Sequence, residues 1–300
     1  MPPQGRQAPP PRRQGGQAQD ESWEAVASWY DSLATDQGTE YHQSVIIPGV
    51  MRLLGIQPDE KVLDLACGQG AVARALHAAG ARVTGIDLSP QLVNLARQRS
   101  PRGITYLVGD ARSLPDLPTG AFDAAICVLA LQNIDPVGPV FAEAARLLRP
   151  GGRLVSVFLH PAFRIPRQSG WRWNEENKLM VREVNRYLSP LKIPIDVRPF
   201  RSPGKQVTWT YHRPLQEYVN GLAGAGLLTD ALEEWPSHRE SQPGARARAE
   251  NRARDEFPLF LALRTVRVEM PQARLFAQEP ARSAPPAPKK KGARDDQGRV

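Results

Sequence analysis

Apolar and polar positions alternate along this chain in a way that is typical of a mixed α/β protein. Short apolar runs at residues 62–65, 82–86, 104–110, 122–128 and 153–155 have the length and composition of buried strands. Between them, apolar residues recur every three or four positions over 71–79 and 137–148, as on one face of a helix. Strands that alternate with helices in this way predict a parallel sheet covered on both faces.

Acidic residues stand at the ends of the first two predicted strands. Asp64 precedes a turn that contains Gly68 and Gly70, and Asp87 follows the second strand. Glycine suits such a turn because the backbone can approach a ligand closely when no Cβ stands in the way. A carboxylate at the tip of the second strand is placed to accept both hydroxyls of a ribose. The pattern therefore predicts a nucleoside site at the carboxyl edge of the sheet.

The details of this turn decide between two classes of cofactor. A dinucleotide fingerprint needs a third glycine, and Ala73 stands at that position. Asp64 would repel a pyrophosphate but would pair well with an ammonium group. The run 62–70 (VLDLACGQG) resembles motif I of the class I S-adenosylmethionine-dependent methyltransferases, with Ala66 in place of the familiar glycine.

This resemblance implies S-adenosyl-L-methionine as the cofactor and also assigns contacts to it. Asp110, which ends the third strand, would accept a hydrogen bond from the exocyclic amine of adenine. The backbone amide of Ala111 would donate one to a nitrogen of the adenine ring. Tyr30 belongs to an aromatic segment that covers the cofactor in similar proteins, where its ring face could meet the sulfonium. The complete set of expected cofactor residues is Tyr30, Asp64, Ala66, Gly68, Gly70, Asp87, Leu88, Asp110, Ala111 and Leu129.

The same resemblance predicts a doubly wound mixed sheet whose last strand is antiparallel. Residues 227–235 resemble the sixth strand, and 258–266 resemble the antiparallel edge strand that follows it; the charged stretch 237–256 is expected to be a solvated connector. We expect one domain over 21–271, with a cofactor-binding core at 61–159, an inserted lid at 160–213 and a C-terminal helix and strands at 214–268. Residues 1–20 and 272–300 are expected to be disordered tails, because they are rich in proline, glycine and charge.

The predicted lid is rich in proline, arginine and tryptophan, and is too long for a simple connection. Phe163, Trp171 and Trp173 could shape an apolar acceptor pocket, and Arg164 and Arg167 could meet an acidic group on the acceptor. A rigid cover with its own small core is the alternative. Residues 207–211 alternate like a strand within this segment.

Methyl transfer from a sulfonium is an in-line displacement that depends mainly on alignment. A general base is needed only for a protonated nucleophile, and His42 and His160 are the two candidates. Each of these histidines could instead be an ordinary buried polar residue. The apolar stretch 129–134 replaces the Asn/Asp-Pro-Pro-aromatic motif of enzymes that methylate nucleic-acid amines, so we expect a small-molecule acceptor and no nucleic acid. A cofactor-binding protein without turnover and a nicotinamide-dependent oxidoreductase remain as alternatives.

Composition changes this picture little. The net charge is +8, but the two predicted tails carry +6 of it, so the charge does not indicate a basic nucleic-acid cleft. No apolar run reaches the length of a membrane span, and the N-terminal residues lack the apolar core of a secretory signal. Cys67 and Cys127 are expected to be free thiols in a reducing compartment such as the cytoplasm. The histidines and cysteines have no spacing that suits a metal site.

Overall fold

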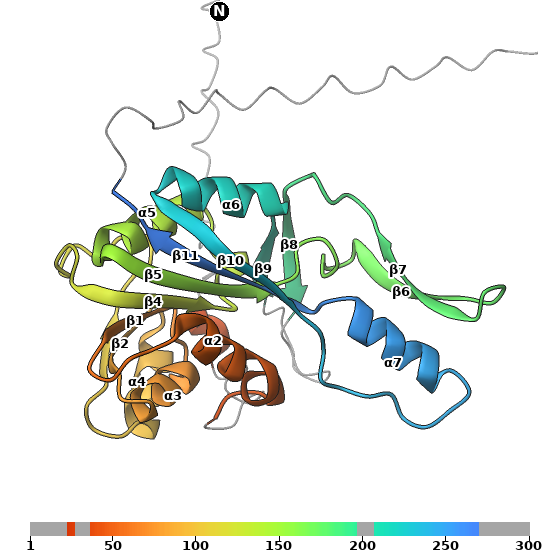
Figure 1. Cartoon of the computed structure of the whole chain (residues 1–300), viewed down its shortest axis with the longest axis horizontal. Helices are drawn as coiled ribbons and strands as arrows, with labels where there is room; N and C mark the ends of the chain where they lie inside the picture. Colours follow the sequence, from red (N-terminus) through yellow and green to blue (C-terminus); the bar gives the residue numbers. More distant parts are fainter. Residues whose placement is uncertain (1–22, 28–36, 197–206, 270–300) are drawn as a thin grey trace, which may run out of the picture. The chain divides into compact units, whose positions relative to one another are not determined.

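A seven-stranded sheet forms the centre of the molecule (Figure 1). This computed structural model describes residues 23–27, 37–196 and 207–269. The strands lie in the order β10-β11-β5-β4-β1-β2-β3. Their bounds are β1 Lys61–Leu65, β2 Arg82–Asp87, β3 Thr105–Val108, β4 Phe122–Val128, β5 Leu148–Leu159, β10 Leu227–Trp235 and β11 Phe260–Arg267. The order reverses between β1 and β4, which is where open sheets of this kind bind ligands.

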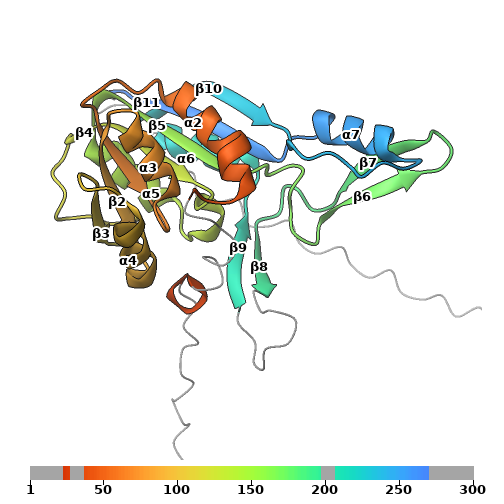
Figure 2. The same ribbon diagram turned by 90° about the horizontal axis from the view of Figure 1, so that it is seen from below.

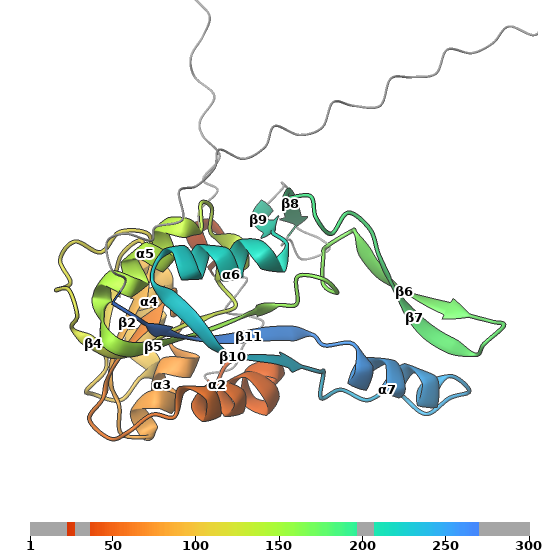
Figure 3. The same cartoon turned by 45° about the horizontal axis from the view of Figure 1, so that its top comes forward.

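Helices cover both faces of the sheet, as the alternating pattern predicts (Figures 1 and 3). On one face lie α2 (Ile47–Leu54), α3 (Ala71–Ala78) and α4 (Pro90–Arg99), and on the other lie α5 (Gly138–Leu147) and α6 (Leu215–Gly224). A π-helical turn, η2 (His42–Ile46), leads directly into α2, which ends at Gly55 in the left-handed conformation. Two 3₁₀ turns, η1 (Trp23–Val26) and η3 (Leu131–Asn133), complete this part of the chain.

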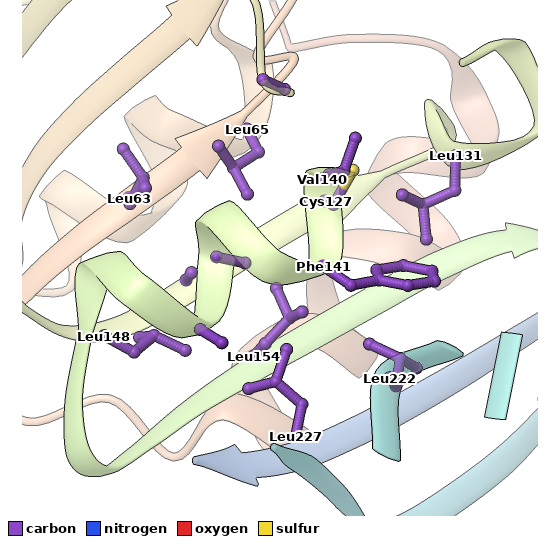
Figure 4. Close-up of a cluster of buried hydrophobic side chains, with 14 of the residues drawn as sticks. Leu63, Leu65, Cys127, Leu131, Val140, Phe141, Leu148, Leu154, Leu222 and Leu227 are labelled. Carbon is purple, nitrogen blue, oxygen red and sulfur yellow. The ribbon is translucent and has the colours of Figure 1, made fainter. Parts of the chain in front are cut away.

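Each face of the sheet has its own apolar core, because successive strand residues point to opposite sides. Leu63 and Leu65 of β1 pack with Cys127 of β4 and Phe141 of α5 on one face (Figure 4). Val62 points the other way and packs with the cluster under α2 and α3. The central strands are therefore apolar almost throughout, and the polar residue Asp64 among them requires an explanation.

The structure corrects the predicted position of the antiparallel strand. β11 is antiparallel as expected, but it pairs with β5 on one side and with β10 on the other, so it is an inner strand. The edge strand is β10. A second correction concerns the predicted connector 237–256, whose last ten residues form the helix α7 (Ala247–Glu256).

The predicted lid consists of two separate β-hairpins. The first pairs β6 (Ser169–Asn174) with β7 (Leu179–Val184), and it lies beside α7 in Figures 1 and 3. The second pairs β8 (Leu191–Asp196) with β9 (Val207–His212), which confirms the strand expected at 207–211. β9 lies against η3, which follows β4 in the chain. Figure 2 shows β8 and β9 side by side and apart from β6 and β7. Only the second hairpin therefore reaches the edge of the sheet where a ligand is expected.

Several predictions fall outside the described residues. Tyr30 and both predicted tails are among them, so the domain boundaries at 21 and 271 stay predictions. Within the described part of the chain, no helix is long and apolar enough to cross a membrane.

Candidate functional site

The turn between β1 and α3 has an unusual backbone. Ala66, Gly68 and Gly70 all adopt positive φ angles, of 57°, 54° and 82°. A Cβ at Gly70 would lie 2.4 Å from the hydroxyl of Tyr106, so this position has no room for a side chain. Glycine is required at position 70 by its backbone conformation and by the packing of Tyr106 against it.

Asp64 is buried in the core beneath this turn, with 1% of its surface exposed. Its Oδ2 atom is buried and has no hydrogen-bond partner among the described residues. Burial raises the pKa of the Asp64 carboxyl to about 8, and the nearby charge of Asp87 adds to the shift. A buried polar oxygen without a partner is costly, so this oxygen is a strong candidate to bind a ligand group, and a cationic group would favour the ionised form.

Asp87 links the turn to the second strand. Its Oδ2 accepts a hydrogen bond from the Gly68 amide at 2.8 Å, and its Oδ1 accepts one from the Ser89 amide at 2.9 Å. Burial raises the pKa of Asp87 as well. Each carboxylate oxygen can accept more than one hydrogen bond, so both oxygens can still receive a donor from a ligand.

Asp110 lies just after β3 and is held by Arg112. The Arg112 Nε and Nη2 atoms bind Asp110 Oδ1 and Oδ2 at 3.0 and 2.6 Å, and this pairing lowers the pKa of the carboxyl. Arg112 also donates to the backbone oxygen of Asp135 at 3.0 Å. Asp110 is therefore oriented by a partner that the sequence reading did not identify.

The loop after β4 is fixed from its other side by Arg213, which is buried. Arg213 Nη2 binds the Asp135 carboxylate at 2.6 Å and the Ile134 carbonyl at 2.7 Å. Arg112 and Arg213 thus hold the same loop from two elements that are far apart in sequence. This loop begins at Leu129, which has a positive φ of 53°.

Two cavities lie at this edge of the sheet. The larger cavity, of about 200 Å³, is lined by Trp23, Ala66, Gly68, Asp87, Leu88, Leu92, Gly109, Asp110, Ala111, Arg112, Val128, Leu129, Ala130, Asn133, Ile134, Asp135 and Tyr211. The smaller cavity, of about 30 Å³, is lined by Gly38, His42, Asp64, Ala66, Cys67, Gly68, Gln69, Ala71, Val72 and Val128. Ala66, Gly68 and Val128 border both cavities, so the two adjoin at the turn.

Most of the residues expected at the cofactor meet here. Seven of them line the larger cavity, and Asp64 lines the smaller one; Gly70 belongs to the same turn but lines neither. The sequence reading missed Trp23, Arg112, Asn133 and Tyr211 as lining residues. In the sequence, Trp23 precedes the predicted aromatic segment by a few residues, and Tyr211 belongs to the predicted strand 207–211. Neither pattern indicated that these side chains line the cavity at the carboxyl edge of the sheet.

The two candidate bases have different surroundings. His42 borders the smaller cavity, and burial lowers its pKa. His160 lines neither cavity: its Nε2 pairs with Glu234 at 2.7 Å, and its Nδ1 accepts from the Ala162 amide at 3.2 Å. The position of His160 favours a structural role, and its role as a base stays an untested prediction.

The tryptophans of the first hairpin do not line either cavity, contrary to expectation. The Trp171 ring packs edge-on against Phe257 with centroids 5.4 Å apart, and the Arg182 guanidinium lies 4.9 Å from its centroid. Arg246 of the segment before α7 covers Trp173 in the same way, at 4.6 Å. The first hairpin thus has side-chain packing of its own, and the choice between a lid and a rigid cover stays a prediction.

Comparisons with known proteins agree with this geometry. Residues 63–156 match the family model described as "Methyltransferase domain". A demethylmenaquinone methyltransferase of Tropheryma whipplei is 42% identical over 113 residues, which are 37% of this chain and 46% of that protein. A ubiquinone biosynthesis O-methyltransferase of Xanthomonas oryzae is 38% identical over 97 residues, which are 31% of this chain and 41% of that protein. The chain thus spans less than half the length of these two relatives.

A solved structure extends the similarity beyond this core. An S-adenosylmethionine-dependent methyltransferase from Mesorhizobium loti superposes with a TM-score of 0.59 and 28% sequence identity, over 73% of this chain and 96% of the other. Residues 63–156 thus match a methyltransferase domain, and the fold resembles that of an S-adenosylmethionine-dependent methyltransferase.

Proposed function

We propose that this protein transfers a methyl group from S-adenosylmethionine to a small-molecule acceptor by in-line displacement. The single observation that carries the proposal is Asp64. A buried carboxylate oxygen without a partner borders a small cavity beside a glycine turn. The α-ammonium group of S-adenosylmethionine would pair with this oxygen in its ionised form, and the charge-assisted hydrogen bond would contribute to affinity.

The larger cavity suits the adenosine part of the cofactor. We assign the ribose hydroxyls to Asp87, whose oxygens retain free acceptor directions, and the adenine amine to Asp110. The Ala111 backbone and the side chains of Leu88 and Leu129 would contact the ring. Tyr30 stays proposed as a contact of the sulfonium.

The acceptor would enter beside the loop after β4. Leu129, Ala130, Ile134 and Tyr211 give this end of the larger cavity a mainly apolar lining, which suits a small, partly apolar molecule. The names of the two relatives, a demethylmenaquinone methyltransferase and a ubiquinone biosynthesis O-methyltransferase, support a partly apolar acceptor.

The chain's own contribution to the reaction would be alignment. When bound, the sulfonium cofactor supplies an activated methyl group, so no covalent intermediate on the protein is needed. Arg112 and Arg213 hold the loop that borders the acceptor, and the turn at Ala66–Gly68 holds the cofactor side. Fixing two reactants in this way can supply about 7–11 kcal/mol of a barrier. We assign no general base.

A nicotinamide-dependent oxidoreductase is disfavoured by the same carboxylate. A dinucleotide would bring its pyrophosphate to the turn above Asp64, where it would hold the carboxyl in its protonated form and gain no charge pairing from it. Cys67 and Cys127 are free, which supports a reducing compartment such as the cytoplasm.

Calorimetry with S-adenosylhomocysteine and NAD, followed by a transfer assay, tests the proposal. The wild-type protein should bind S-adenosylhomocysteine and not NAD, and it should move label from S-adenosyl-[methyl-³H]methionine into a small-molecule fraction. Asp87→Ala should weaken binding by about 2–4 kcal/mol, because two ribose hydroxyls lose their acceptor. Binding without transfer to any acceptor in a metabolite extract would indicate a cofactor-binding protein, and NAD binding would overturn the assignment.

A further inference from the structure

The hydroxyl of Tyr211 is a polar group of the larger cavity to which the proposed function gives no role. Tyr211 lies on β9 and is half-buried at the cavity wall. The nearby polar side chains bond to one another: the Thr210 hydroxyl donates to Asn133 Oδ1 at 3.4 Å, and Asn133 Nδ2 donates to the Leu129 carbonyl at 3.3 Å. Within the described part of the chain, the Tyr211 hydroxyl forms no hydrogen bond.

The ring of Tyr211 is held in place by two cations. The Cζ atom of Arg213 lies 5.4 Å from the ring centroid, and the Nζ atom of Lys192, its cross-strand neighbour in the hairpin, lies 5.9 Å from it. The hydrogen bond to Asp110 is the main reason that the pKa of Arg112 is raised, and the Tyr211 hydroxyl contributes a smaller part. The hydroxyl therefore lies near Arg112, which lines the same cavity.

The charges around this end of the cavity are matched in pairs. Arg112 Nη2 lies 2.6 Å from Asp110 Oδ2, and Arg213 Nη2 lies 2.6 Å from Asp135 Oδ1. Each guanidinium thus has a carboxylate partner. A charged acceptor would have to displace one of these partners or stay unpaired in a partly closed space, and both are costly.

The two arginines that the sequence suggested for an acidic group are engaged elsewhere. Arg167 Nη2 donates to the Pro194 carbonyl at 3.0 Å. Arg164 Nε and Nη2 lie 3.4 Å from the carbonyl oxygens of Pro258 and Phe257. Neither arginine lines the larger cavity, so the described residues that do line it present no unpaired cation to an acidic acceptor.

We propose that the Tyr211 hydroxyl binds a hydroxyl or carbonyl group of a neutral, mainly apolar acceptor. A phenol hydroxyl can donate to a carbonyl oxygen, and it can donate to or accept from another hydroxyl. Because the surrounding polar groups are paired, an acceptor without such a group would leave the Tyr211 hydroxyl without a partner. The inference rests on the proposed function, and it names Tyr211 as a specificity-determining residue.

The charge of the methylated product tests the first part of the inference. Wild-type protein is incubated with S-adenosyl-[methyl-³H]methionine and a metabolite extract, and the labelled product is passed over an anion exchanger and a cation exchanger at neutral pH. The product should pass through both resins and should partition into an organic solvent. Retention on either resin would overturn the assignment of a neutral acceptor.

Tyr211→Phe tests the hydrogen bond, with the acceptor identified by mass spectrometry of the labelled product. This variant keeps the ring, so kcat/KM for the acceptor should fall about 5- to 50-fold while the affinity for S-adenosylhomocysteine changes less than about 2-fold. Analogues of the acceptor that each lack one hydroxyl or carbonyl group extend the test. With the analogue that lacks the bound group, wild type and Tyr211→Phe should agree within about 2-fold. An equal loss with every analogue would show that the hydroxyl does not bind the acceptor.

Tyr187→Phe is the matched control. The Tyr187 hydroxyl accepts a hydrogen bond from the Leu215 amide at 3.0 Å, and this residue lines neither cavity. The control variant should lower the melting temperature and leave kcat/KM for the acceptor within about 2-fold of wild type.

The outcomes separate this inference from the proposed function. If the wild-type protein binds no S-adenosylhomocysteine or transfers no label, the proposed function fails and this inference fails with it. If label is transferred but the product is charged, or Tyr211→Phe keeps the wild-type kcat/KM, the inference is overturned while the proposed function stands. If Tyr211→Phe does not fold, the analogues decide with wild-type protein, because removal of the bound group should lower kcat/KM by a similar factor.

Discussion

Two residues other than glycine have left-handed backbone conformations at the larger cavity. Ala66 has a φ of 57° and Leu129 a φ of 53°, and both line that cavity. For a residue with a Cβ this conformation costs about 1–2 kcal/mol. The positive φ explains why glycine is familiar at the position of Ala66. The fold therefore stores strain where the ligand is expected, a pattern that is typical of binding sites.

Ala66→Gly should raise the free energy of unfolding by about 0.5–1 kcal/mol, because it removes the strain at the cost of some unfolded-state entropy. The affinity for S-adenosylhomocysteine should change less than about 2-fold. Urea denaturation measures the first value, and calorimetry the second. Ala78→Gly, in the ordinary helix α3, is the control and should destabilise the protein by about 0.5–1 kcal/mol. Equal destabilisation by both variants would contradict the strain argument.

The raised pKa of Asp64 predicts that ligand binding releases a proton. Because burial raises its pKa to about 8, the carboxyl of the free protein is protonated at neutral pH. An ammonium beside it would favour the ionised form, so binding of S-adenosylhomocysteine at about pH 6.5 should release close to one proton. Affinity should then rise as pH increases toward about 8 and level off above it.

Titration calorimetry in buffers of different ionisation enthalpy measures how many protons are released when S-adenosylhomocysteine binds. Asp64→Asn has no proton to release, so its binding should be weaker and nearly independent of pH over the same range. Proton uptake by the wild-type protein, or an unchanged release in the variant, would show that Asp64 does not meet the ammonium.

At the scale of elements, the sequence predicts the central strands and their helices well and the periphery poorly. β1, β4 and α6 were predictable because most of their residues follow the apolar pattern of a buried strand or of one helix face. The inner position of β11 was not, since the pairing of an antiparallel strand depends on neighbours that are distant in sequence. α7 is mostly charged, and it gave no apolar stripe to read.

The site shows the same division. The acids at strand ends were predictable from local motifs, whereas the positions of Arg112 and Tyr211 depend on tertiary contacts. The tryptophans of the first hairpin were misplaced for this reason too: aromatic content indicates packing, but it does not say against which surface.

The two hairpins should respond differently to mutation. Trp171→Ala should remove packing between β6 and Phe257 and lower the melting temperature, while cofactor affinity and turnover stay within about 2-fold of wild type. Tyr211→Ala changes the wall of the larger cavity and should alter turnover or the acceptor KM. Steady-state kinetics compare the two variants once an acceptor is found. If only Trp171→Ala lost turnover, the first hairpin, and not Tyr211, would contribute to the acceptor site.

At the scale of the whole molecule, the net charge of +8 belongs mainly to residues that should not contribute to the fold. A protein limited to residues 21–271 should keep its melting temperature within a few degrees and its affinity for S-adenosylhomocysteine. The reason is that segments rich in proline and charge bury too little surface to offset their ordering entropy. Scanning calorimetry and titration measure both quantities. A larger fall in melting temperature would show that one of the removed segments packs on the domain.

The inner position of β11 has a consequence for synthesis on the ribosome. β11 is the last of the seven strands in the chain, yet it is the one that pairs with both β5 and β10. Until residues 260–267 have been synthesised, a nascent chain would leave the pairing edge of β5 open and β10 without its partner in the sheet. Open edges of this kind are templates for aggregation. Premature termination shortly before β11 should therefore be far more harmful than loss of the residues after it.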